Sequence, residues 1–348
     1  MAPSTRAAAE DDSAAHQAAA HQAAARPAAK PLTDTSATPG PRGLRSRLHR
    51  FDVRASPYVF VAPFFLCFAA FGLFPLVWTG WLSLHRVDLL DPDAMSWLGL
   101  DNYARLLDAD RGEQFRNALG NTVTIGVLST VPQLLMALGL AHLLNYRLRG
   151  RGFLRVAVLA PYATSIAAAT LVFVQLFNPD YGLVNWFLSL VGVRPDWYAD
   201  TWPAQIAIST VVTWRWTGYN ALIYLAAMQS VPKDLYEAAS LDGASRWQQF
   251  TRVTVPSIRP TILFTAVVST IGATQLFGEP LLFGGGVGVS GGSAHQYQTL
   301  ALYMYELGWP SRQLGRAAAV AWSMLLILLL IGAVQYLIAR RNRAPQEG

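Results

Sequence analysis

Five stretches of this chain contain no Asp, Glu, Lys or Arg and are long enough to cross a lipid bilayer. They are residues 55–84, 117–146, 156–179, 260–278 and 317–339, and a sixth stretch, 201–232, is interrupted only by Arg215. A spanning helix needs about 20 mostly apolar residues. Keeping a charge out of a span avoids a cost of roughly 2.5–3.5 kcal/mol. The pattern predicts a membrane protein.

The composition agrees, because only 14% of the 348 residues are charged and the mean hydropathy is +0.28, whereas soluble domains carry about 25% charged residues. The alternative is a large soluble protein with buried core helices. We predict an all-α polytopic membrane protein with six transmembrane helices at about 57–84, 118–144, 154–177, 203–229, 260–282 and 315–339. Cys67 lies inside the first span as a small packing residue, and a disulfide within the chain is excluded because it is the single cysteine.

The first 41 residues are of low complexity and are expected to form a disordered cytoplasmic tail. Residues 42–348 are expected to form one six-span domain. His16 and His21 lie in the tail without a Cys or carboxylate partner at ligand spacing, so we expect no metal site. The polar stretch before the first apolar run is too long for a secretory signal peptide, so that run should serve as an uncleaved anchor.

The basic residues set the expected orientation, because arginine and lysine accumulate on the cytoplasmic side of short loops. Sixteen lie on one side, in the segments 42–54, 147–155, 233–259 and 340–343, against seven on the other. We therefore expect both termini, and the loop between spans 4 and 5, to be cytoplasmic. These arginines are spread over four loops rather than one face, so the net charge of +6 is no sign of nucleic-acid binding.

The segments on the outer side differ in character. Residues 85–116 form a long acidic loop with a short helix expected at "DNYARLLD", and residues 178–202 are expected to hold an interfacial helix rich in Trp and Tyr. The loop 283–313 opens with the glycine run "FGGGVGVSGGS". This run is no phosphate loop, since no GK[ST] follows it.

The polar loop 230–259, between spans 4 and 5, contains "EAASLDGASRWQQFTRVTVP". Pro232 suits the first turn of a helix, and Leu235, Ala238, Ala239 and Asp242 then share one face. Gly243 would end that helix. The Ser245–Gln248 pair forms a capping box that starts a second helix, in which Trp247 and Phe250 are neighbours that tie the segment to its own bundle, and Pro256 stops it. The result is a helix-turn-helix elbow, which taken alone could be an ordinary interfacial segment.

This stretch resembles the EAA loop of ABC-importer permeases, with Glu237, Ala238 and Ala239, then Gly243, and Pro256 at the end. Val253 and Val255 replace the isoleucine and leucine that are most often seen. The lead-in "GYNALIYLAAMQSVPKDLYEAA" and the later "ALYMYELGWPSRQLGRAAAVAW" resemble the carbohydrate branch, of the maltose and glycerol-3-phosphate type. The resemblance covers roughly residues 55–342.

The resemblance implies a permease subunit that makes no covalent change. Its partners would be a second homologous permease, two cytoplasmic ATPase subunits that bind the ATP, an extracytoplasmic solute-binding protein, a sugar and membrane lipid. The elbow would be the coupling helix that inserts into an ATPase cleft, with Glu237 facing a basic group there and with Asp242 on the small-residue face. The implied location is the bacterial cell membrane, and the scarcity of lysine suggests a GC-rich bacterium.

Polar residues inside spans 4 and 5 are the candidates for the solute path. Arg215 is a functional candidate because buried arginines are costly, or else it braces the helices by pairing with a carboxylate such as Glu279 or with backbone carbonyls. Tyr219 and Asn220 offer stacking and hydrogen bonds to a sugar. Ser269 and Ala273 form a small face that serves either packing or solute. Tyr219 and Ser269 match the family's sugar-contacting region, whereas Arg215 leaves a charged or phosphorylated solute possible.

Two other classes of protein compete with the importer permease. A self-contained secondary transporter would show an internal repeat and a coupling carboxylate deep in a span, yet the only acid near a span is Glu279, at its end. A membrane enzyme or sensor would need a catalytic constellation or a further soluble domain. The sequence contains no Walker A, H-E-x-x-H, G-x-S-x-G or CxxC motif, so we expect no enzyme and no cofactor of its own.

Overall fold

The computed structural model describes residues 58–88, 91–146, 149–284 and 291–341. The predicted tail, residues 1–41, and most of the glycine run lie outside these residues. The chain divides into two units, Met1–Phe68 and Ala69–Gly348. In the first unit, the described residues 58–68 are helical, and the ring of Phe64 lies 5.5 Å from Phe65 and 6.4 Å from Phe68.

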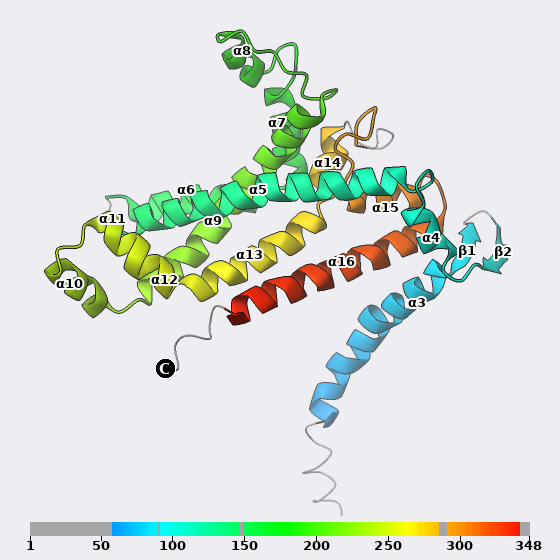
Figure 1. Cartoon of the computed structure of the whole chain (residues 1–348), viewed down its shortest axis with the longest axis horizontal. Coiled ribbons are helices and arrows are strands. Elements are labelled where there is room, and N and C mark those ends of the chain that lie inside the picture. The colour runs from blue at the N-terminus through cyan, green and yellow to red at the C-terminus, as the bar shows by residue number, and fades with distance from the viewer. Residues whose placement is uncertain (1–57, 89–90, 147–148, 285–290, 342–348) are drawn as a thin grey trace, which may run out of the picture. The chain divides into compact units, whose positions relative to one another are not determined.

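The second unit is mostly helical (Figure 1). Its elements in chain order are η1 (Ala69–Leu73), α3 (Phe74–Ser83), β1 (His85–Asp88), β2 (Asp91–Trp97), α4 (Asp101–Leu107), α5 (Glu113–Asn145), α6 (Arg151–Ala163), α7 (Ile166–Leu176), α8 (Leu183–Ser189) and α9 (Thr201–Gln229). They continue with α10 (Lys233–Leu241), α11 (Arg246–Gln249), η2 (Phe250–Thr254), α12 (Val255–Ser257), α13 (Arg259–Thr274), α14 (Gly278–Phe283), α15 (Leu300–Gly308) and α16 (Leu314–Arg341).

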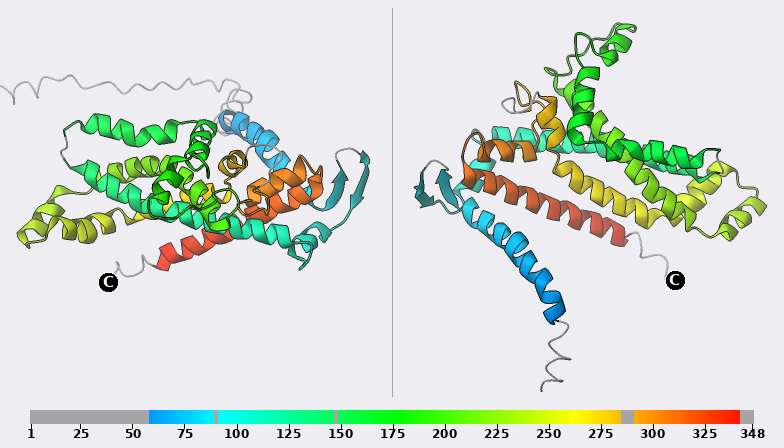
Figure 2. Two further views of the ribbon diagram at one scale, coloured as in Figure 1. Left: turned by 90° about the horizontal axis from the view of Figure 1, so that it is seen from above. Right: turned by 180° about the vertical axis from the view of Figure 1, so that it is seen from behind.

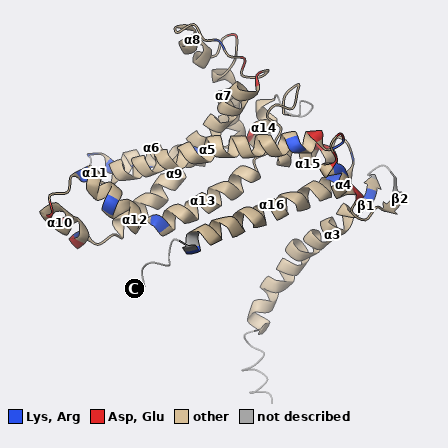
Figure 3. Ribbon diagram, in the orientation of Figure 1, with Lys and Arg blue, Asp and Glu red and all other residues tan. Residues whose placement is uncertain are grey.

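Three helical segments in the described part of the chain are long and apolar enough to cross a membrane: Tyr58–Ser83, Glu113–Asn145 and Leu314–Ile338. The total rises to five if each of two bent pairs, α6 with α7 and α11–α12 with α13, counts as one span. Charged residues stand mainly near the ends of the long helices (Figure 3). This arrangement keeps ions out of the hydrocarbon core.

The helix α9 is long enough to span but lies at the centre of the bundle, with α5, α6 and α13 against it. Ala204, Ala207, Ile208 and Val211 are fully buried on it. Several polar residues are buried there as well, namely Gln205, Ser209, Thr213, Arg215, Thr217 and Asn220. Because neighbouring helices cover much of α9, its buried polar side chains find hydrogen-bond partners there.

The predicted third span, 154–177, is wrong as one continuous helix, because α6 and α7 meet at an angle of 92°. Thr164 and Ser165 are extended, with ψ near 139° and 137°. Pro161, in the last turn of α6, has no N–H to donate and weakens the end of that helix.

The predicted fifth span, 260–282, also breaks, since α13 ends at Thr274 and α14 begins at Gly278. Pro280 has no N–H to donate to the carbonyl of Leu276. That carbonyl instead accepts a hydrogen bond of 2.6 Å from the hydroxyl of Thr299. The loop before α15 thus takes over the bond that a continuous helix would have made.

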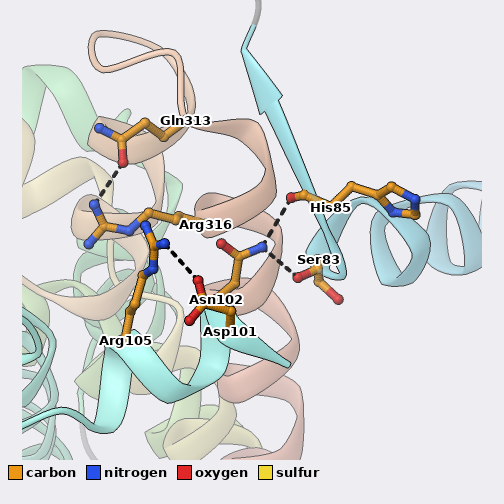
Figure 4. Close-up of polar contacts among 7 residues, drawn as sticks. All are labelled: Ser83, His85, Asp101, Asn102, Arg105, Gln313 and Arg316. Carbon is orange, nitrogen blue, oxygen red and sulfur yellow. Dashed lines mark hydrogen bonds and ion pairs between the residues drawn. The ribbon is translucent and has the colours of Figure 1, made fainter. Parts of the chain in front are cut away.

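The segment 85–116, predicted as an outer loop, departs from the all-α prediction because β1 and β2 pair as an antiparallel hairpin, with His85 opposite Trp97. The short helix expected at "DNYARLLD" is confirmed as α4. Asn102 on α4 donates hydrogen bonds to the carbonyls of Ser83 (2.8 Å) and His85 (3.0 Å), as Figure 4 shows. These bonds attach α4 to the junction between α3 and the hairpin.

The hairpin and the elbow helices α10 and α11 lie at opposite ends of the second unit in both views of Figure 2. The short helix expected within 178–202 is confirmed as α8. The helix α14 was predicted only as the end of the fifth span, and α15, in the predicted loop 283–313, was not predicted from the sequence. In the described residues of the second unit, the long helices therefore lie between the hairpin at one end and the elbow at the other.

Candidate coupling elbow and translocation path

The elbow is a helix-turn-helix whose turn is fixed by its own backbone. Gly243 has a φ of +74°, a conformation in which other residues are strained. The N–H of Gly243 donates to the carbonyl of Ser240 (3.1 Å), and the N–H of Ala244 donates to that of Ala239 (2.9 Å). These two bonds form a Schellman motif, which confirms the predicted end of the first helix. Pro232 lies one residue before α10 rather than in its first turn.

The second helix of the elbow begins with the predicted capping box. The hydroxyl of Ser245 accepts from the N–H of Gln248, while the Gln248 side chain accepts from the N–H of Ser245 at 2.7 Å. Two further contacts join the helices, since Tyr236 and Thr254 share a hydrogen bond of 3.0 Å and the Gln249 amide donates to the Ser240 hydroxyl at 3.0 Å. The elbow is therefore internally braced.

The two aromatic residues of the elbow have different surroundings. Phe250 is 7% exposed and packs in a core cluster with residues of α5 and α9. Trp247 is 67% exposed, so the expectation that it ties the elbow to the bundle is wrong. Trp247 lies two residues after Ser245, in the first turn of α11, and its ring contacts that of Phe250 with centroids 5.5 Å apart.

The elbow exposes apolar and acidic side chains. Leu241 is 90% exposed and Leu235 47% exposed, and Trp247, Glu237, Ala238 and Asp242 are exposed as well. Ala239 is half-buried. Neither Glu237 nor Asp242 forms an ion pair with any residue that the structure describes.

Pro256 does not stop the second helix, because α12 continues through it to Ser257. The five-residue π-helical turn η2 ends at Thr254, two residues before this proline; such single π-helical turns occur within α-helices. The chain instead bends by 69° between Ser257 and Arg259. Pro260, at the start of α13, provides the reason, since it cannot donate to the preceding turn.

At the centre of the bundle, Arg215 on α9 donates to the carboxylate of Glu279 on α14 at 3.0 Å. Both side chains are buried, and the same guanidinium reaches the carbonyl of Thr164 at 3.5 Å. That carbonyl lies at the break between α6 and α7. Arg215 therefore joins α9 to the end of α6, the start of α7 and the start of α14. This is the bracing role that the sequence offered as one of two alternatives.

Tyr219 belongs to an aromatic cluster that it forms with Tyr162 and Trp216. The Tyr219 ring stacks on Tyr162 with centroids 4.7 Å apart, and Trp216 meets Tyr219 edge-on at 5.7 Å. Tyr162 is 37% exposed, and the other two rings are half-buried. Tyr162 was missed in the sequence because it lies 57 positions before Tyr219, on a helix whose facing partner no local spacing reveals.

The remaining path candidates lie on buried helix contacts. Asn220 donates to the hydroxyl of Ser269 at 3.4 Å, and one turn further the hydroxyls of Tyr224 and Thr265 are 2.6 Å apart. Ala273 is 9% exposed and faces Gly126 on α5. Asn220, Ser269 and Ala273 are thus brought together where α5, α9 and α13 meet, whereas Tyr219 lies in a separate cluster.

The contact between α6 and α9 depends on a glycine. A Cβ atom at Gly218 would lie 1.8 Å from the carbonyl oxygen of Val158. The two backbones therefore approach each other more closely than any larger residue allows. This contact holds the aromatic cluster together, since Trp216 and Tyr219 flank Gly218 and Tyr162 follows Val158 by about one turn.

Comparison with known proteins connects these features. Residues 127–344 match the family model of the binding-protein-dependent transport system inner membrane component. The lactose transport system permease protein LacF of Rhizobium radiobacter is 36% identical, over 86% of this chain and 98% of that protein. The trehalose/maltose transport system permease protein MalF of Thermococcus litoralis is 33% identical, over 82% of this chain and 94% of that protein.

The fold is also similar to a solved structure. A chain in the crystal structure of a bacterial ABC transporter involved in the import of the acidic polysaccharide alginate has a TM-score of 0.69 and 25% identity, with 85% of this chain and 99% of that chain covered. The match runs over almost the full length of these relatives. This multi-pass membrane chain therefore belongs to the family of binding-protein-dependent transport system inner membrane components.

Proposed function

We propose that this chain is the permease subunit of an ATP-driven sugar importer. With a second homologous permease it would form an alternating-access path for a sugar that an extracytoplasmic binding protein delivers. The chain itself catalyses no reaction, and ATP would bind to two separate cytoplasmic ATPase subunits. The observation that carries the proposal is the near full-length similarity to permeases named for lactose and for trehalose/maltose.

The buried ion pair favours a neutral sugar over a phosphorylated solute. Arg215 is the cation that lies deepest inside a predicted span, but Glu279 neutralises it at 3.0 Å. The half-buried rings of Tyr219, Trp216 and Tyr162 offer stacking surfaces of the kind that suits the apolar faces of sugars. We therefore place Tyr219 at the solute path and assign Arg215 and Glu279 to bracing it, with Asn220, Ser269 and Ala273 in the adjoining helix contact.

Six spans and a cytoplasmic elbow complete the proposal. Besides the five spans allowed by apolarity, α9 supplies the sixth, because 29 residues extend about 44 Å. The helices α6, α13 and α16 each carry arginine at one end, and these cationic ends would face the cytoplasm, together with both termini.

The elbow would be the coupling element. Its exposed Leu235, Leu241 and Trp247 form an apolar surface of the kind that partner proteins bury. Glu237, which has no ion-pair partner among the described residues, would meet a basic group of the ATPase. The internal hydrogen bonds of the elbow would let it transmit a push as a rigid body.

Two experiments test the proposal. The chain, tagged and extracted in mild detergent from its native cell, should co-purify with an ATPase and a second permease. Recovery of a single species under several detergents would contradict the importer function. Deletion of the gene should abolish growth on at least one sole carbohydrate source, and unimpaired growth on every carbohydrate tested would contradict the substrate class.

A further inference from the structure

A cavity of about 480 Å³ lies between the elbow and the neighbouring ends of the long helices. Its walls come from the ends of α5 and α9, the start of α6, and both elbow helices. Arg151 on α6, Lys233 on α10 and Arg246 on α11 line it from three different elements. No Asp or Glu is among its lining residues in the described part of the chain.

Neutral groups alone contact these cations in the described residues. Arg151 and Arg155 both reach the amide of Gln229, at 2.7 and 2.9 Å when the amide oxygen faces them. The Nε atom of Arg151 is buried without a hydrogen-bond partner. Arg246 lies over the ring of Tyr146, 5.4 Å from its centroid. Three positive charges thus share a cavity without a carboxylate to balance them.

Hydrogen-bonding side chains complete the cavity. Tyr146 and Tyr236 line it beside the cations, and each hydroxyl can donate to an oxygen anion when it accepts its present hydrogen bond from His142 or Thr254. Arginine and lysine with such donors are typical of phosphate recognition. The cavity also lies at the ends of bilayer-crossing helices, where lipid headgroups are located, and basic pockets between such helices bind anionic headgroups.

We propose that this cavity binds a phosphate group, supplied by the headgroup of an anionic phospholipid. The lipid source rests on the cytoplasmic orientation proposed above; free inorganic phosphate offers the same chemistry. The bound phosphate bridges Lys233 on α10, Arg246 on α11 and Arg151 on α6. It therefore holds the elbow at a set angle to the bundle and makes the coupling element sensitive to the lipid composition of the membrane.

Lipid binding to the purified full chain tests the proposal. Native mass spectrometry in detergent compares phosphatidylglycerol with phosphatidylcholine for the wild type and for K233Q/R246Q. Each cation near a membrane surface is worth about fivefold in affinity, so the double variant should bind phosphatidylglycerol about 25-fold more weakly. The matched control is R252Q/R259Q, which removes two exposed charges of the same segment outside the cavity.

The outcomes separate the possibilities. Selective loss in K233Q/R246Q, restored in K233R/R246K, supports the site, and unchanged thermal unfolding of the variants excludes misfolding as the cause. Displacement of phosphatidylglycerol by millimolar inorganic phosphate identifies free phosphate as a competing ligand of the same site. Equal weakening in R252Q/R259Q, or equal binding of phosphatidylcholine, overturns the proposal, and neither result affects the assignment of the chain as an importer permease.

Discussion

Arg215 and Glu279 lie 64 positions apart in the sequence and meet at 3.0 Å inside the bundle, with side chains 9% and 4% exposed. Loss of one partner of such a pair leaves an uncompensated buried charge, which costs about 3–5 kcal/mol. We expect R215M or E279L alone to lower the thermal unfolding temperature in detergent markedly. The double variant R215M/E279L should recover much of the loss. Single variants that unfold like the wild type would contradict the bracing role.

Gly218 sets the distance between α6 and α9. Replacement by alanine places a Cβ atom 1.8 Å from the carbonyl oxygen of Val158, so the helices must separate. We expect G218A to reduce folded yield and to lower the unfolding temperature, with a cost of at least 1–3 kcal/mol from overpacking. The matched control is G272A on α13, where an added Cβ meets no atom within 4 Å. Equal stability of the two variants would contradict the close-approach argument.

The elbow offers a separate test of coupling. Charge reversal in E237K should stop solute uptake while the chain remains folded in the membrane, because this exposed acid forms no ion pair with any residue that the structure describes. In contrast, G243A strains a residue with φ of +74°, at a cost of roughly 1–2 kcal/mol. Uptake assays combined with co-purification of the ATPase distinguish the effect of the lost charge in E237K from the effect of the strained turn in G243A. Normal uptake by E237K would show that this acid is not needed for coupling.

Glu306 on α15 provides a pH-dependent contribution. Burial raises the pKa of this carboxyl, while the hydrogen bond from Gln298 and the charge of His295 partly oppose the rise. A raised folded-state pKa stabilises the fold below the ordinary value of 4.5, and this contribution is lost as the pH rises through the folded-state pKa. We expect E306Q, which stays neutral, to become more stable relative to the wild type as the pH increases above 4.5. A pH series of thermal unfolding checks this, and parallel curves would contradict it.

Much of this architecture was predictable because its signals are local. Charge-free windows mark the long helices, and the capping box at Ser245 and the glycine at position 243 mark the ends of the elbow helices. Each of these signals depends on residues within a few positions of one another. The family resemblance of the elbow added a function that no single residue in it reveals.

The departures have long-range causes. The break after Thr274 depends on Thr299, whose hydroxyl takes the carbonyl that Pro280 leaves free. The bend after α6 exposes the Thr164 carbonyl to Arg215, on a different helix. None of these partners can be identified from periodicity in one segment.

The aromatic cluster gives the sharpest test of the solute path. Tyr219 stacks on Tyr162 with centroids 4.7 Å apart, so loss of either ring removes one face of the cluster. We expect Y219A to weaken sugar uptake while ATPase association stays intact, and Y162A to do the same, whereas Y219F should retain most uptake. The matched control is F264A on α13, which removes an aromatic ring that is 59% exposed and lies outside the cluster. Unchanged uptake kinetics in Y219A and Y162A would place the solute site on the partner permease.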